Sequence, residues 1–256
     1  MNKIERVVFL DKNTPPHIFT LIIVSGLGAL SMSIFLSSIL EMSLYFDKSY
    51  ALMQLSISLY LLSTAIFQII AGPLSDKFGR RLITLSSVIM FILASLGCFF
   101  STQFELFIFF RILQASVAAG FLMSRVIIRD ITSESEAASM IGYVTMGMSI
   151  IPLFAPGFGG LIHMYLGWPS IFLIMALLGL FLLYLVFKDL GETKIVKKNS
   201  NKKYLGSNFE LLKETKFWGY TLTLAFSAGT FFSFLGGSPY VATKIYNLNS
   251  VVSGLL

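Results

Sequence analysis

Long apolar runs alternate with short polar clusters along the whole chain. The runs cover residues 18–40, 51–71, 82–101, 104–125, 138–162, 167–188 and 217–236. Each is close to the roughly 20 mostly apolar residues that an α-helix needs to cross a bilayer. The pattern predicts seven membrane-spanning helices, with an eighth beginning near Val251. That last run is only a few residues long, so we expect a fragment or an early-terminated product.

Composition agrees with an all-α membrane protein and argues against several other classes. Of the 256 residues, 55% are hydrophobic and 12% are charged, whereas a typical soluble domain has roughly 25% charged residues. The single cysteine, Cys98, excludes an intrachain disulfide or a CxxC metal site. The sequence has no Walker loop, no metal-ligand cluster and no Ser/His/Asp arrangement. We therefore expect neither enzymatic activity nor a bound cofactor.

The basic residues, which give a pI of about 9.4, predict the orientation of the chain. They lie beside the ends of the apolar runs and form no interleaved basic and aromatic face, so we expect no nucleic-acid partner. With a cytoplasmic N-terminus, only Lys48 and Lys244 lie outside. The positive-inside rule therefore predicts a multi-pass protein whose N-terminus is cytoplasmic. The first 16 residues lack the apolar segment of a removable signal peptide.

One long polar stretch divides the chain. Residues 189–216 are rich in Lys, Asn and Ser and predict a basic cytoplasmic linker. It separates a complete six-helix bundle, residues 1–188, from the beginning of a second bundle, residues 217–256. The linker lysines can attract anionic lipid headgroups, but we favour a solvated cytoplasmic loop that follows the positive-inside rule.

The sequence GPLSDKFGRR follows the second apolar run and predicts a tight cytoplasmic loop. Gly72 would allow close helix approach, and Gly79 would allow a tight turn. Asp76 would meet the basic Arg80 and Arg81 and could latch a neighbouring helix end. The stretch resembles the signature loop of the major facilitator superfamily, which implies a gating role. The alternative is that its charges only set the topology.

A polar pair lies within the fourth apolar run. Arg111 is about 10 Å inside its predicted helix, where an unpaired arginine costs at least about 2.5 kcal/mol. Gln114 is three residues further on and shares the same helix face. The sequence RILQ resembles the RxxQG motif of the same superfamily, with Ala115 in place of glycine. The resemblance implies proton coupling, and the alternative is an arginine that snorkels outward or braces the packing.

The fifth apolar run is rich in proline and glycine. Such residues are tolerated in membrane helices, and small residues allow another helix to approach closely. The run resembles the antiporter motif of the superfamily, although Ala155 replaces a usual glycine. The resemblance implies a kinked, closely packed helix that seals one state against leak. The residues that carry it are Gly147, Pro152, Pro156, Gly157, Gly159 and Gly160.

Two further stretches, RVIIRD at 125–130 and FFSFLGGSPY at 231–240, resemble the branch associated with bicyclomycin and chloramphenicol resistance. We expect Arg125, Arg129 and Asp130 to form a latch at the inner membrane face, with Asp130 close to Arg80. The alternative for Asp130 is an exposed helix cap.

The chain departs from that branch in the first helix. Members usually carry an acidic residue there, whereas this chain has Ser33. The nearest acid, Glu41, is expected at the periplasmic rim. Aromatic and methionine side chains suit an apolar drug pocket, but for any one of them we favour a lipid-facing position. The residues concerned are Met32, Phe35, Tyr60, Phe67 and Met123.

The resemblance implies an all-α major facilitator fold in a bacterial inner membrane. It further implies export of small apolar or amphipathic drug-like compounds by proton antiport and alternating access, with protons and membrane lipid as the other partners. Two alternatives stay open: nutrient uptake by a symporter or uniporter of the same superfamily, and an inactive truncated membrane fragment.

Overall fold

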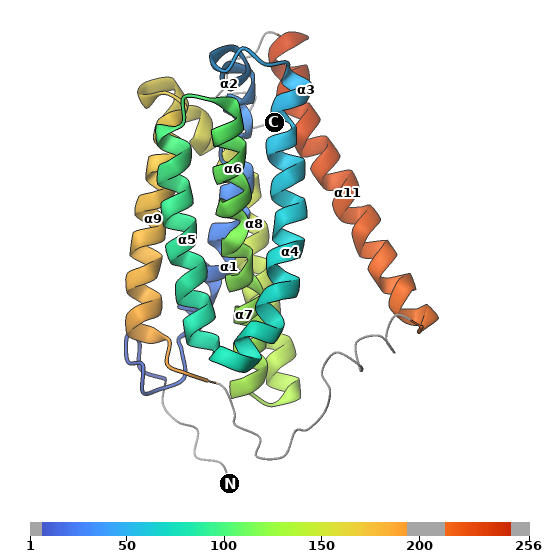
Figure 1. Cartoon of the computed structure of the whole chain (residues 1–256). Helices are drawn as coiled ribbons and strands as arrows, with labels where there is room; N and C mark the ends of the chain where they lie inside the picture. The colour runs from blue at the N-terminus through green and yellow to red at the C-terminus, as the bar shows by residue number, and fades with distance from the viewer. Residues whose placement is uncertain (1–6, 194–212, 247–256) are drawn as a thin grey trace.

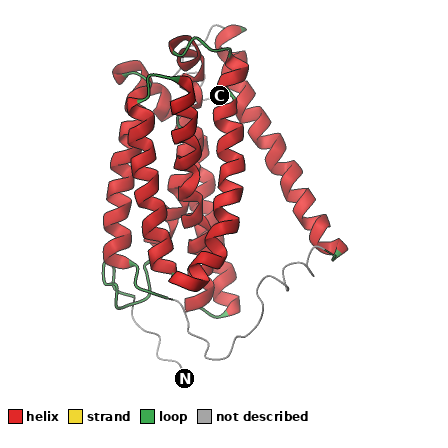
Figure 2. Cartoon of the chain, in the orientation of Figure 1, coloured by secondary structure: helices red, strands yellow, loops and turns green. Residues whose placement is uncertain are grey.

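The computed structural model describes residues 7–193 and 213–246, and this part of the chain is all helical (Figure 2). The predicted all-α fold is therefore confirmed. In chain order the elements are α1 (Ile18–Ser33), η1 (Leu36–Ser38), α2 (Ile39–Tyr45), α3 (Tyr50–Met53), α4 (Leu55–Phe78), α5 (Arg80–Phe100), α6 (Phe104–Gln114), η2 (Ala115–Val117), α7 (Ala118–Ile131), α8 (Glu134–Leu166), α9 (Pro169–Asp189) and α11 (Thr215–Lys244).

Six helical segments in the described residues are long and apolar enough to cross a membrane. They coincide with the first six apolar runs and form an upright bundle (Figure 1). The 30-residue α11 contains the expected seventh span. It falls outside these six, because many Gly, Ser and Thr residues dilute its apolar side chains, so its role as a span stays a prediction. The expected eighth helix near Val251 lies outside the described residues.

Several helix ends differ from the sequence prediction. The first span continues to Tyr45 rather than residue 40, and the second continues to Phe78 rather than residue 71. The charged Glu41, Asp76 and Lys77 end the apolar runs but do not end the helices. The sixth span ends at Asp189, one residue beyond the predicted bundle boundary.

Two spans are composite, because a short 3₁₀ segment interrupts each. The segment η1 joins α1 to α2, and η2 joins α6 to α7 directly after Gln114. A 3₁₀ stretch within a long helix often marks a hinge. Two glycines with positive φ separate other helices: Gly79 (φ 99°) lies between α4 and α5, and Gly167 (φ 79°) ends α8.

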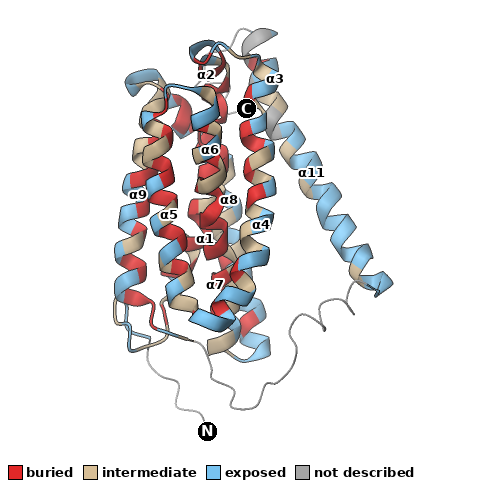
Figure 3. Ribbon diagram, viewed as in Figure 1, coloured by how far each residue is buried: buried red, intermediate tan, exposed pale blue. Residues whose placement is uncertain are grey.

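Burial follows the packing of the bundle. Buried residues line its interior, whereas exposed residues cover the outer faces and most of α11 (Figure 3). The outer faces are rich in Leu, Ile and Phe, which suits contact with lipid tails. The ring centroids of Tyr50 and Tyr240 lie 4.8 Å apart and connect α11 to the bundle.

The first and fifth spans make a close seam between α1 and α8. A Cβ added to Gly147 would lie 2.7 Å from a methyl carbon of Ile22. One added to Gly159 would overlap the backbone carbonyl of Ile34. The Ser37 hydroxyl also donates to the Pro156 carbonyl across 3.0 Å. Gly147, Pro156 and Gly159 of the predicted motif therefore lie at a tight helix crossing, and at Gly159 a Cβ would meet backbone that no side-chain movement can clear.

Candidate functional site

The predicted signature loop is mostly helical. Residues 72–78 belong to α4, with Pro73 inside that helix, and Arg80 already begins α5. The turn is confined to Gly79, whose φ of 99° disfavours any residue with a Cβ. A Cβ at Gly72 would meet nothing within 4 Å, so the predicted close helix approach at this residue is wrong.

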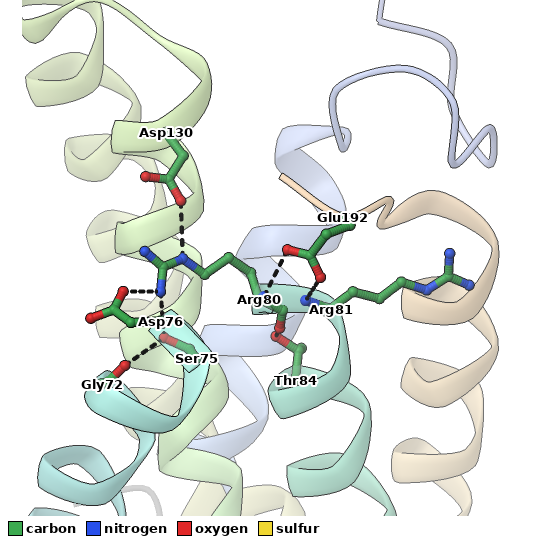
Figure 4. Close-up of polar contacts among 8 residues, drawn as sticks. All are labelled: Gly72, Ser75, Asp76, Arg80, Arg81, Thr84, Asp130 and Glu192. Atoms are coloured by element: carbon green, nitrogen blue, oxygen red, sulfur yellow. Dashed lines mark hydrogen bonds and ion pairs between the residues drawn. The ribbon is translucent and has the colours of Figure 1, made fainter. Parts of the chain in front are cut away.

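Arg80 connects the α4–α5 turn to α7. Its Nε donates to Asp130 across 3.0 Å, and its Nη1 donates to Asp76 and to the Ser75 hydroxyl, both across 2.6 Å (Figure 4). The Arg80 side chain is only 12% exposed, so these charge-assisted bonds are partly shielded from water. The structure thus brings Asp130 to Arg80, as the sequence predicted.

Arg125 and Arg129 do not join this ion-pair cluster. The Arg125 guanidinium carbon lies 4.2 Å from the Phe121 ring centroid, and Arg129 is exposed. Neither forms an ion pair in the described part of the chain. The two arginines are one helical turn apart, whereas Asp130 is rotated about 100° from Arg129. Their predicted membership of the latch is therefore wrong.

Glu192, which follows the sixth span, is a site residue that sequence reasoning missed. Its two carboxylate oxygens accept from the backbone N–H groups of Arg80 and Arg81, at 2.9 and 3.3 Å (Figure 4). These groups open α5 and have no partner within that helix, so the carboxylate caps it and complements its dipole. Arg81 also donates to the Phe187 carbonyl across 3.0 Å. The cluster therefore spans four helices.

Asp189 is a second missed residue. It is fully buried, and its carboxylate oxygens accept from the backbone N–H groups of Leu10 and His17, at 2.8 and 2.9 Å. This carboxylate ties the segment before α1 to the end of α9. An acidic residue directly after an apolar run was a visible signal, but its partners lie more than 170 positions away.

Arg111 is fully buried in the bundle, which excludes the outward-snorkelling alternative. Its Nη1 donates to the Gln114 amide oxygen and to the Ser31 carbonyl, the latter across 3.3 Å. Its guanidinium carbon lies 4.2 Å from the ring centroid of Phe35 and 4.6 Å from that of Tyr60. Aromatic faces attract a desolvated cation, so the charge is held by dipoles and rings.

The polar network continues from Arg111 into α5. The Gln114 amide nitrogen donates to the Ser95 hydroxyl across 2.7 Å, and that hydroxyl donates to the Phe91 carbonyl across 2.8 Å. No carboxylate lies within ion-pair distance of Arg111 among the described residues. The ion pairs instead lie toward the ends of the spans. A hydrogen bond of 3.0 Å between the Glu41 carboxylate and the His163 imidazole also joins α2 to α8.

A cavity of about 470 Å³ lies between the six-helix bundle and α11. This volume is within the range of small-molecule sites. Helices α1, α4, α7 and α8 supply most of the wall, and Phe231 and Phe232 of α11 complete it. The lining residues are Ser25, Gly28, Ala29, Met32, Ser33, Tyr60, Leu61, Thr64, Gln68, Ala118, Phe121, Met148, Ser149, Pro152, Phe231 and Phe232.

The preferred lipid-facing placement is wrong for four of the five aromatic and methionine residues. Met32 and Tyr60 line the cavity, while Phe35 and Met123 are fully buried. Phe67 is half-buried against the core.

These features define a polytopic helical membrane protein with a central cavity, a buried arginine behind the cavity wall and an ion-pair cluster at one end. The sequence profile of the Major Facilitator Superfamily, a family of membrane transporters, matches residues 21–256. The chain belongs to this superfamily.

Its relatives support the resemblance to the resistance branch. The chain is 32% identical to an uncharacterized MFS-type transporter, YdgK of Bacillus subtilis, over 93% of the chain and 61% of the relative. It is 30% identical to the chloramphenicol resistance protein of Pseudomonas aeruginosa (83% and 51%). It is also 30% identical to a bicyclomycin resistance protein homolog of Haemophilus influenzae (93% and 61%). The chain thus spans between half and about three fifths of these relatives.

A solved structure shares the fold. It is an inward-facing bacterial homolog of the human lysosomal transporter Spinster, with a TM-score of 0.75 and 17% identity over 93% of this chain and 57% of that one. The predicted major facilitator fold is therefore confirmed.

Proposed function

We propose that the chain forms the first bundle, and the beginning of the second, of a proton-coupled exporter of small apolar or amphipathic compounds. The observation that carries this proposal is the central cavity between the bundle and α11. In major facilitator transporters the substrate site lies near the midplane between two repeats that rock against each other. The cavity is lined by residues of the six-helix bundle and of α11.

The direction of transport is taken from the relatives. Two of them are named for chloramphenicol resistance and bicyclomycin resistance. Removal of a compound from the cytoplasm is one direct route to resistance. We therefore infer export rather than uptake, and a bacterial inner membrane with the Arg80 end of the bundle on the cytoplasmic side.

Coupling is assigned to Arg111 and Gln114. Arg111 is the largest fully buried side chain of the described residues, and the Tyr60 ring that it contacts also lines the cavity. Binding of a compound in the cavity can therefore change the surroundings of the guanidinium, because the Tyr60 ring contacts both. The buried cation would change the proton affinity of titratable groups that border the cavity. It would not itself lose its proton, because arginine stays protonated in proteins.

Gating is assigned to the ion-pair cluster around Arg80. Asp130 connects it to α7, and Glu192 connects it to the segment after α9. When these contacts form, they hold α4, α5, α7 and α9 together at one end of the bundle. When they break, the ends of all four helices can separate. Such a cluster suits a bistable element that alternates between two packed arrangements.

The test is accumulation of chloramphenicol in efflux-deficient bacteria that express the longest natural polypeptide containing this chain. We expect lower accumulation, reversed by a protonophore and by Arg111→Gln, while the exposed Arg129→Gln serves as the matched control. Increased accumulation would indicate uptake. Unchanged accumulation with confirmed membrane expression would refute export.

A further inference from the structure

The cavity wall carries no charged side chain among the described residues. Its polar groups are the hydroxyls of five residues and the amide of Gln68. Four of the hydroxyls donate to backbone carbonyls of their own or a neighbouring helix: Ser33 to Ala29, Tyr60 to Gly28, Thr64 to Leu61 and Ser149 to Thr145. Because their protons are engaged, these hydroxyls offer lone pairs to the cavity. The wall therefore suits ligands that donate hydrogen bonds.

A positive charge lies directly behind this neutral wall. The Arg111 guanidinium carbon is 4.6 Å from the ring centroid of Tyr60, which itself lines the cavity. No carboxylate pairs with Arg111 in the described residues, and its other contacts are an amide, a carbonyl and aromatic rings. These dipoles stabilise the charge without cancelling it. The cavity is thus bounded by an unneutralised cation in a poorly screened interior.

We propose that this cavity accepts uncharged aromatic compounds with hydroxyl or amide N–H donors and rejects organic cations, and that Arg111 sets this preference. The inference rests on the proposed function, because it takes the cavity as the substrate site. Two unit charges about 10 Å apart, at an effective dielectric constant of about 20, change an affinity by about tenfold. The aromatic residues Phe121, Phe231 and Phe232 offer ring stacking to a neutral ligand.

The experiment compares two probes on the purified chain in lipid nanodiscs, with empty nanodiscs to subtract partitioning. Chloramphenicol is the neutral donor-bearing probe, and tetraphenylphosphonium is the aromatic cation. We expect chloramphenicol to bind at least about tenfold more tightly.

Matched variants test the electrostatic cause. Arg111→Gln removes the charge behind the wall and should reduce the preference for chloramphenicol by about tenfold; an unchanged preference in this variant would overturn the role of Arg111. Ser33→Asp places a carboxylate in the cavity wall on α1, and Ser149→Asp does so on α8 in case the first variant fails to fold. Either should shift the ratio of affinities toward the cation by about tenfold. Ser135→Asp adds the same charge at an exposed position in the first turn of α8, far from the cavity, and should leave the ratio unchanged.

The outcomes separate this inference from the proposed function. Equal or tighter binding of tetraphenylphosphonium, an unchanged ratio in both wall variants, or no binding of either probe would overturn the inference. The predicted selectivity in nanodiscs without any change in cellular accumulation would instead refute export alone. Export of cations in cells would refute the selectivity while export itself stands.

Discussion

The seam between the first and fifth spans allows a sharp test of the packing, by the substitution Gly159→Ala. A Cβ at this position would overlap the carbonyl oxygen of Ile34 and lie 2.7 Å from its carbonyl carbon. Both atoms belong to the backbone of the first span, so no side-chain rotation can relieve the overlap. The variant can fold only if α8 moves away from the first span.

The expected cost follows from this geometry. Overpacking a close-packed interior costs typically about 1–3 kcal/mol, and we expect the upper end because the neighbour is backbone. For a helical domain of this size, about 3 kcal/mol lowers Tm by about 6–12 °C. Gly142→Ala is the matched control, since a Cβ there meets nothing within 4 Å and Gly142 lies exposed on the same helix. The control should not lower Tm.

The chain supplies its own probe for the measurement. Cys98 is the only cysteine and is fully buried in α5. A thiol-reactive dye that fluoresces on reaction will therefore report unfolding during a temperature ramp in detergent. Equal Tm values for Gly159→Ala and Gly142→Ala would show that the helices do not meet as described, and the reasoning from the seam would fail.

Three further outcomes are expected. Arg80→Gln removes two partly shielded ion pairs and should cost about 1–3 kcal/mol in the same thiol assay, whereas Arg129→Gln should stay within about 0.5 kcal/mol; similar values for both would contradict the cluster. Asp189→Asn replaces one of two acceptor oxygens with a donor, so amide hydrogen exchange should accelerate within residues 8–17 and nowhere in α5; unchanged exchange there would refute the tether. Gln114→Leu leaves the buried guanidinium without its side-chain acceptor and should lower Tm by about 4–10 °C, an effect whose absence would show that the hydrogen bond is dispensable.

The local sequence was sufficient to predict the six spans of the first bundle and the positions of the main motifs along them. The six apolar runs of the first bundle each became a spanning helix, and the inward placement of Arg111 followed from its depth in one of them. The contact between Asp130 and Arg80 was also predictable, since both lie at the same end of antiparallel helices. Each of these conclusions needs only hydropathy and helix geometry, because the sequence shows long apolar runs and no alternation typical of strands.

The contacts that complete the site were beyond local reasoning. Glu192 caps α5 across more than 100 positions, and Asp189 binds backbone groups near the N-terminus. Likewise, nothing local distinguishes Arg125, which stacks on Phe121 of its own helix, from Arg80, whose side chain contacts two other helices. The lipid-facing preference for Met32 and Tyr60 was wrong for the same reason, because it depends on how each helix is rotated.

The sequence by itself determined that this chain crosses a membrane repeatedly and where the six helices of the described bundle lie. A spanning helix satisfies its own backbone hydrogen bonds, and its transfer into lipid depends on its own side chains, so this information is local. Only the tertiary structure decided which side chains share the cavity, which charges pair and which glycines lie at crossings. Those outcomes depend on the rotation and separation of helices distant in sequence, which are set by packing among all of them.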